Sequence, residues 1–190
     1  MTLISRPPNQ RQPCWGFWSH KGGATAIEFG LVGLPFVLLL LVILEASLLL
    51  TAQLTFNNAV DRGARQVLTG NFQEKSDGTD PAVRLRKSIC EGFVMFSCAD
   101  LKVEVTTSPT YRTPSATNPY DADKKAMAEG FGNRFDCPNG DEIVSIRAAT
   151  TVSAYLPMVD FTGSKIGTDK QLILATAVFR SEPFGPGRCQ

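Results

Sequence analysis

The chain has 190 residues, enough for one modest domain and a membrane segment. Hydrophobic residues make up 43% of the chain, and 19 basic residues against 18 acidic ones leave a net charge of +1. This balance leaves no large basic surface, which argues against nucleic acid as a partner.

The N-terminal residues 1–23 carry three basic side chains and no acidic one. A long apolar segment follows, so this basic flank predicts that the N-terminus lies on the cytoplasmic side of a membrane. Proline residues and the aromatic pair Trp15 and Trp18 are typical of a short disordered leader with an anchor at the membrane interface. We therefore expect residues 1–23 to form a cytoplasmic leader.

The segment Phe29–Leu54 predicts a transmembrane helix. Its only charged residue is Glu45. Its 26 residues would extend about 39 Å as a helix, whereas about 20 apolar residues suffice to cross a bilayer. A buried helix of a soluble protein is the alternative, but such a helix seldom lacks a polar stripe over four turns. We assign residues 24–54 to the membrane.

The same helix is expected to continue beyond the membrane. In residues 55–70 apolar side chains recur at helical spacing, with polar ones between them. Gly70 and Asn71 form a typical stop signal. The pattern predicts one helix of about 46 residues from Ala24 to Thr69, roughly 69 Å long. Pro35 removes a backbone bond to Leu31, so we expect the helix to be kinked or loosened there.

Residues 71–190 predict an extracytoplasmic domain that begins with a polar turn at Asn71–Asp80. A helix is expected within Pro81–Ser97, with a proline in its first turn. Its apolar residues should pack on the domain; these are Val83, Ile89, Phe93 and Phe96.

Three segments rich in β-branched residues predict strands, namely Leu101–Thr107, Glu142–Leu156 and Lys170–Glu182. Residues 108–141 predict a long connection between strands, with a short helix near Asp121–Glu129. Three strands can form a small antiparallel sheet with one face covered by helices. The expected fold class is α+β, a long N-terminal helix followed by a small antiparallel sheet.

Five cysteines are distributed over the two sides of the membrane. The predicted topology places Cys14 inside and the other four outside, where an oxidising compartment allows two disulfides in three possible pairings. We favour Cys90–Cys98, which closes a short loop, and Cys137–Cys189. Zinc is the rival interpretation, but the sequence has no CxxC motif and its only histidine is His20.

The sequence offers little sign of catalysis. With His20 in the leader, the external domain cannot form a Ser–His or Cys–His pair. The acidic pairs Asp121/Asp123 and Asp141/Glu142 lie in predicted loops, where solvated turn residues are the ordinary explanation. We therefore expect no enzyme activity, no cofactor and no metal site.

The most informative residues stand at the entrance to the membrane. Glu28 is the fifth residue after Gly23, with a basic leader before them and an apolar run after them. A carboxylate in the first helical turn, favoured by the helix dipole, would explain Glu28 by itself. The spacing from Gly23, however, resembles the type IV prepilin processing site, in which a glycine precedes a chain whose fifth residue is acidic.

A longer ordered set of residues resembles the TadE-like family of tight-adherence pilus assembly proteins. The resemblance covers about residues 21–70. Its members typically show a Gly-Ala-x-Ala-[Ile/Val]-Glu-Phe run, a second acid after a leucine-rich segment, and an Ala-x-x-x-Gly-Ala-Arg stretch. The matching residues here are Gly23, Ala24, Ala26, Ile27, Glu28 and Phe29, then Glu45, then Ala59, Gly63, Ala64 and Arg65.

This resemblance implies a minor pilin, or pseudopilin, in the bacterial inner membrane. A prepilin peptidase would cut between Gly23 and Ala24, although the preceding Gly22 also allows a cut one residue earlier. Other pilin-like subunits and the inner-membrane assembly platform would be the partners. A buried Glu28 carboxylate would need a partner, and the free amine of Ala24 on a neighbouring subunit would fix the register between subunits.

Glu45 lies 17 residues, or about 25 Å, beyond Glu28 along a helix. Two interpretations stay open: a carboxylate at the outer membrane boundary, or a register contact with another pilin-like helix. For the whole chain, the alternative to a pseudopilin is an uncleaved, signal-anchored protein whose external domain scaffolds or binds an envelope complex.

Overall fold

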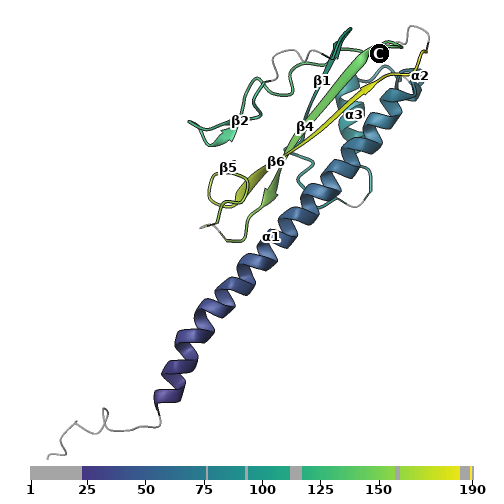
Figure 1. Cartoon of the computed structure of the whole chain (residues 1–190). Coiled ribbons are helices and arrows are strands. Elements are labelled where there is room, and N and C mark those ends of the chain that lie inside the picture. Colours follow the sequence, from purple (N-terminus) through teal and green to yellow (C-terminus); the bar gives the residue numbers. More distant parts are fainter. Residues whose placement is uncertain are drawn as a thin grey trace, which may run out of the picture. The chain divides into compact units, whose positions relative to one another are not determined.

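The computed structural model describes residues 23–75, 77–92, 94–111, 117–156, 159–184 and 189. The chain divides into two compact units, Met1–Leu41 and Val42–Gln190, which we describe separately (Figure 1). The predicted leader lies outside the described residues, apart from Gly23.

The long N-terminal helix, α1, extends over Ala24–Leu68 and confirms the expected helix to within one residue at its end. It continues through Pro35. Gly70 ends it with a positive φ of 77°, a conformation that favours glycine. A side chain at this position would also come within 2.9 Å of the Phe184 ring, so the stop depends on glycine for two reasons.

Four strands form one antiparallel sheet in the order β1-β4-β6-β5, drawn beside the later part of α1 in Figure 1. Their bounds are β1 Lys102–Ser108, β4 Ile143–Ser153, β5 Lys165–Ile166 and β6 Lys170–Arg180. The three predicted strands are present, and β5 is a short addition at the edge. A long apolar helix followed by a small antiparallel sheet confirms the α+β fold class.

The core of the second unit lies between one face of the sheet and the helices. From α1, Phe56, Val60 and Val67 are fully buried. They join side chains from α3 and the sheet, which include Leu85, Ile89, Val105, Ile146 and Ile173. The rings of Phe56 and Phe96 meet edge to face at 4.8 Å. Each such side chain contributes about 1.5–3 kcal/mol by leaving water.

The strand β1 does not follow the simple alternation that its sequence suggests, because Glu104 is buried together with the apolar positions. Arg147 of β4 lies 3.5 Å from the Glu104 carboxylate, and the two residues are partners in the strand register. The arginine also donates to the Thr117 carbonyl at 2.7 Å. The ion pair with Arg147 therefore compensates the charge of the Glu104 carboxylate, which lies on a covered face of the sheet.

The predicted turn Asn71–Asp80 was wrong in part, because Asn71–Glu74 forms a short helix, α2. Phe72 and Gln73 are buried in it. Arg84 holds α2 in place, since its guanidinium donates to the Phe72 carbonyl at 2.5 Å and lies 4.3 Å from the centre of the Phe72 ring.

The helix predicted within Pro81–Ser97 is shorter than expected. It forms α3, Pro81–Cys90, and begins where the sequence indicates, with the Asp80 carboxylate accepting from the Ala82 and Val83 amides. Gly92 follows with a φ of 98°, outside helical geometry. Ile89 and Phe96 are buried as expected, but Val83 is exposed, and Phe93 lies outside the described residues.

The helix predicted near Asp121–Glu129 was wrong. The segment instead forms two short antiparallel strands, β2 Tyr120–Asp121 and β3 Ala126–Met127. The Asp121 carboxylate accepts from the amides of Asp123 and Lys124, both at 3.1 Å. Such a turn competes directly with a helix, because aspartate satisfies nearby backbone groups without helical hydrogen bonds.

Candidate functional site

Gly23 lies immediately before α1, and nothing in the described part of the chain requires a glycine at this position. It is exposed, and a Cβ atom added to it would meet nothing within 4 Å. Its φ is not among the positive values that favour glycine. A glycine that neither packing nor backbone conformation requires is a candidate for recognition by another protein.

Glu28 is the fifth residue of α1 and lies beyond its first turn, which contains no acidic residue. The dipole explanation for Glu28 is therefore weak, because the dipole effect falls off within the first turn. Glu28 is exposed, and among the described residues it has no hydrogen bond or ion pair. The carboxylate is thus available to a group from another molecule.

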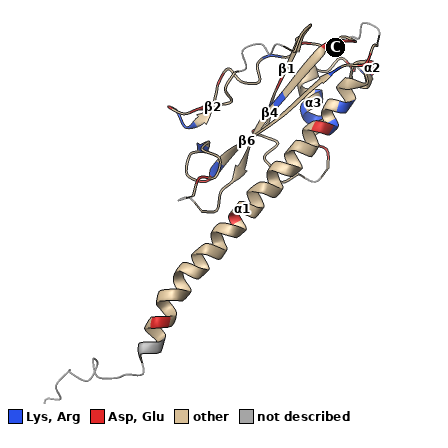
Figure 2. Cartoon of the chain, viewed as in Figure 1, with Lys and Arg blue, Asp and Glu red and all other residues tan. Residues whose placement is uncertain are grey.

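Around Glu28 and beyond it, α1 exposes a nearly continuous apolar surface. Figure 2 shows few charged positions in this part of the helix. Within the described chain, α1 is the one helix that is long and apolar enough to cross a membrane, over Ala26–Leu68. Soluble monomers rarely expose apolar patches of more than a few hundred Å². These residues are consistent with a single-pass membrane anchor; the large exposed ones are Ile27, Phe29, Leu31, Val32, Leu34, Phe36, Val37, Leu38, Leu39, Leu40, Leu41, Ile43 and Leu44.

Glu45 has a different environment from Glu28. Only 4% of it is exposed, and its Oε1 accepts a hydrogen bond from the Tyr155 backbone amide at 2.9 Å. A small cavity of about 120 Å³ lies beside this contact, between Leu48, Met95 and Tyr155. The structure therefore gives Glu45 a partner within its own chain, a contact that neither sequence interpretation contained.

The small residues of the TadE-like stretch lie where α1 packs against the domain. Ala59 and Ala64 are buried, as is Gly63. A Cβ atom at Gly63 would lie 3.1 Å from Ile89 and 3.3 Å from Leu85 of α3. A larger residue would separate the two helices, so this part of the motif has a folding role. The Arg65 side chain is exposed in the last turn of α1.

Both disulfides that we favour from the sequence are present. Cys90 is bonded to Cys98, with their Cα atoms 6.1 Å apart, and Cys137 is bonded to Cys189, with their Cα atoms 5.9 Å apart. The first follows the end of α3, and the second joins the region before β4 to the region after β6. In the part of the chain that the structure describes, no three His, Cys, Asp or Glu side chains cluster closely enough to hold a metal ion.

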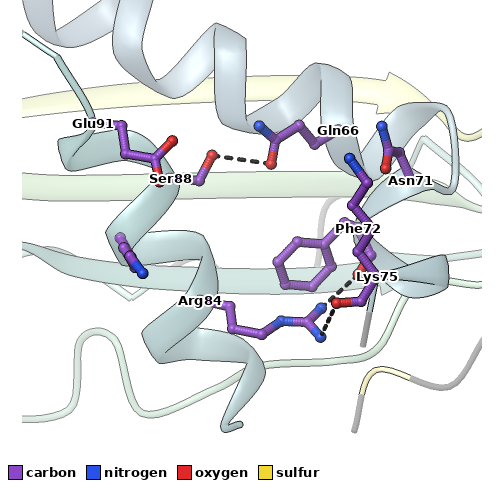
Figure 3. Close-up of a pocket in the computed structure, with 8 residues that line it drawn as sticks. Gln66, Asn71, Phe72, Lys75, Arg84, Ser88 and Glu91 are labelled. Carbon is purple, nitrogen blue, oxygen red and sulfur yellow. Dashed lines mark hydrogen bonds between the residues drawn. The ribbon is translucent and has the colours of Figure 1, made fainter. Parts of the chain in front are cut away.

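A cavity of about 320 Å³ lies between the end of α1, α2 and α3 (Figure 3). Its polar groups bond to one another. Ser88 donates to the Gln66 side chain at 3.0 Å, and Arg84 donates to the Lys75 carbonyl at 3.3 Å as well as to the Phe72 carbonyl. These contacts hold the three helices together.

The comparisons with known proteins agree with the resemblance at the N-terminus. A family model described as "TadE-like protein" matches residues 23–65, from the glycine before α1 to the arginine in its last turn. No curated protein and no solved structure matches the chain. Residues 23–65 are therefore similar to the TadE-like family, and this similarity covers less than half of the chain.

Proposed function

We propose that this chain is a minor pilin, or pseudopilin, that takes part in assembling a tight-adherence (Flp, type IVb-like) pilus or the related secretion apparatus. The observation that carries the proposal is the start of α1. There Gly23, which is exposed and has room for a side chain among the described residues, precedes an exposed Glu28 with no partner among them. Both residues belong to the segment that matches the family.

In this proposal the chain has four parts. Residues 1–23 are a cytoplasmic leader, residues 24–54 cross the inner membrane, residues 55–70 continue the helix, and residues 71–190 form the extracytoplasmic domain. The two disulfides support an oxidising compartment for the last part, since such bonds persist outside the cytosol. The protein has no catalysis of its own and requires no cofactor.

Prepilin peptidase would cut between Gly23 and Ala24, which leaves Ala24 with a free amine. Glu28 would then accept that amine from a neighbouring subunit in the membrane. A carboxylate surrounded by apolar side chains is costly unless it is paired, so this contact would favour one axial register. Other pilin-like subunits and the inner-membrane assembly platform are the proposed partners, together with the lipid bilayer.

Mass spectrometry of protein extracted from membranes tests the processing step. We expect Ala24 as the mature N-terminus in the parent chain, and an intact leader in a Gly23→Ala variant or a peptidase deletion strain. Gly22→Ala is the matched control, because it should leave the cut after Gly23 unchanged. An intact Met1 in cells that assemble the pilus would contradict the proposal and favour the uncleaved, signal-anchored scaffold protein.

The assembly role of Glu28 is measured in the same strains. Glu28→Gln should be cleaved normally but should co-purify with several-fold less of the other pilin-like subunits. Co-purification equal to that of the parent would show that Glu28 does not set the register.

A further inference from the structure

The hydrogen bond between Glu45 and Tyr155 fixes the connection between β4 and β5 beside one short stretch of α1. Tyr155 follows the end of β4 by two residues, and its amide donates to Glu45 at 2.9 Å. The Ala154 amide donates at 2.7 Å to the carbonyl of Asp169, which directly precedes β6, so the start of the connection is also bonded to the turn between β5 and β6. The start of this connection is therefore held at the level of Glu45 along α1.

The side chains around this contact are apolar and exposed. Tyr155 is 72% exposed. Leu48 borders the cavity next to Tyr155, and Leu44 lies one helical turn before Leu48 on the same face of α1. We call Leu44, Leu48 and Tyr155 the Tyr155 surface.

The length of the apolar segment indicates where this surface lies. Ala26–Leu44 contains 19 residues, which extend about 28 Å as a helix, close to the roughly 30 Å of a bilayer's hydrocarbon core. The proposed membrane part, residues 24–54, extends about 46 Å as a helix, close to the roughly 40–45 Å of a bilayer with its headgroup layers. If Ala26–Leu44 fills the hydrocarbon core within it, Glu45 lies at the far boundary of that core. The Tyr155 surface, held at Glu45, then falls in the layer between hydrocarbon and water.

The chemistry of the surface suits that layer. Tyrosine is enriched at membrane interfaces because its ring is apolar and its hydroxyl group is polar. The connection Ala154–Ser164 contains one charged residue, Asp160. The Asp160 carboxylate accepts from the Gly163 amide at 2.8 Å and from the Thr162 amide at 3.1 Å, which offsets part of its desolvation near lipid.

We propose that the Tyr155 surface is a second membrane contact, which lies in the interfacial layer of the outer leaflet, with Glu45 as its positioning residue. The contact would seat the domain directly on the bilayer before the subunit leaves the membrane. This inference rests on the membrane span of the proposed function, but it does not depend on cleavage of the leader. Because the surface is apolar, the contact should not require anionic lipid.

Fluorescence quenching in lipid vesicles tests the contact with the full chain. Trp15 and Trp18, the only tryptophans, are first changed to phenylalanine, and one reporter is then introduced as Tyr155→Trp. The vesicles are phosphatidylcholine with a doxyl quencher either near the headgroup or near the end of the acyl chain. We expect the reporter to be quenched several-fold more by the shallow quencher than by the deep one.

Tyr111→Trp is the matched control. Tyr111 is also 72% exposed, but it follows β1, whose last residue Ser108 pairs with Ile143 at the opposite end of β4 from Tyr155. This reporter should not be quenched by either lipid. Equal quenching of the two reporters would overturn the proposal. If the reporter at position 155 is shielded from water only at a high ratio of protein to lipid, a second copy of the chain covers the surface. That result would also overturn the proposal.

A third reporter, Phe36→Trp, separates the two proposals. Strong quenching of this reporter by the deep lipid shows that the span is inserted, so that a negative result at position 155 rejects the Tyr155 surface alone. If position 36 is not quenched either, the span of the proposed function fails.

The role of Glu45 has its own pair of variants in the Tyr155→Trp background. Glu45→Gln keeps an oxygen acceptor for the amide and should retain the quenching. Glu45→Leu removes the acceptor and should reduce the quenching at position 155 while leaving that at position 36 unchanged. Full quenching in Glu45→Leu would overturn the assignment of Glu45 as the positioning residue.

Discussion

Asp100 connects three parts of the second unit through one carboxylate. Its Oδ2 accepts from the Thr151 hydroxyl of β4 at 2.6 Å and lies 3.1 Å from the Lys170 ammonium at the start of β6. The hydroxyl first, and then the lysine, lower the pKa of Asp100 from its ordinary value of 3.8. Folding therefore favours the ionised form of this carboxylate.

The lowered pKa of Asp100 makes part of the stability depend on pH. This contribution is fully present above the unfolded pKa of 3.8 and is lost as the pH falls through the lower, folded value. Asp100→Asn should therefore lower the free energy of unfolding at about pH 7 and have a smaller effect at about pH 3. Denaturant titrations of the purified protein at both pH values measure the difference.

Asp169→Asn is the control for this measurement, since Asp169 is exposed and adjacent to Lys170. It should change the free energy of unfolding by less than about 0.5 kcal/mol at neutral pH. An effect of Asp100→Asn that is as large in acid as at neutral pH would refute the contribution of the ionised carboxylate.

At the scale of elements, α1 has two halves with different neighbours, and the sequence distinguishes them. The first half is apolar on all sides, and the structure leaves Ile27, Leu34 and Leu44 exposed. In the second half the apolar residues recur on one face, and the structure buries Phe56 and Val60. The hydrophobic pattern therefore predicted the length of the helix and separated its two halves, and the structure adds that the amphipathic half packs on its own domain.

Gly63 determines how closely α3 approaches α1. Gly63→Leu should lower the free energy of unfolding by about 1–3 kcal/mol, because the new side chain must displace Ile89 and Leu85 from contact distance. Asp61→Leu adds the same side chain at an exposed position of the same helix and should cost less than about 0.5 kcal/mol. Thermal and chemical unfolding compare the two variants, and equal stabilities would show that close packing at Gly63 is not required.

The elements that the sequence did not predict depend on local hydrogen bonds or on distant contacts. The segment after Asp121 has residues compatible with a helix, but the Asp121 carboxylate bonds the next amides, and Lys125 has a positive φ of 46°. The burial of α2 depends on contacts distant in the sequence, such as Arg84, 12 residues beyond Phe72, and Pro138, whose carbonyl accepts from Gln73. The hydrophobic periodicity of the sequence shows neither local side-chain hydrogen bonds nor contacts between distant residues.

At the scale of the whole chain, the candidate site was predictable where it is a linear motif and not where it is a contact. Gly23 and Glu28 stand five residues apart within a longer ordered set of residues, so the sequence by itself suggests a processing site, and its cleavage stays a prediction. Glu45 and Tyr155 are 110 residues apart, and no local pattern connects them. The disulfides could be predicted in part from the sequence. The predicted topology limited the four external cysteines to three possible pairings, and the short loop closed by Cys90–Cys98 favoured the pairing that contains this bond.

The two disulfides should contribute unequally to stability, because they close loops of different length. Their cysteines are separated by 52 residues in Cys137–Cys189 and by 8 residues in Cys90–Cys98. Loop-closure entropy then predicts a loss of about 4 kcal/mol for the longer loop and about 2.5 kcal/mol for the shorter one. Cys→Ala double variants of each pair, compared by denaturant unfolding, measure the two values.

The longer disulfide also has a positional role that the shorter one lacks. Cys189 is buried and lies beyond β6, so its bond to Cys137 fixes the chain after the last strand. Removal of this pair should therefore expose the C-terminal region to proteases, whereas removal of Cys90–Cys98 should not.

A non-reducing peptide map identifies the pairs directly, and four free external thiols would refute both. An equal loss of stability in the two variants would show that loop length does not control their contribution.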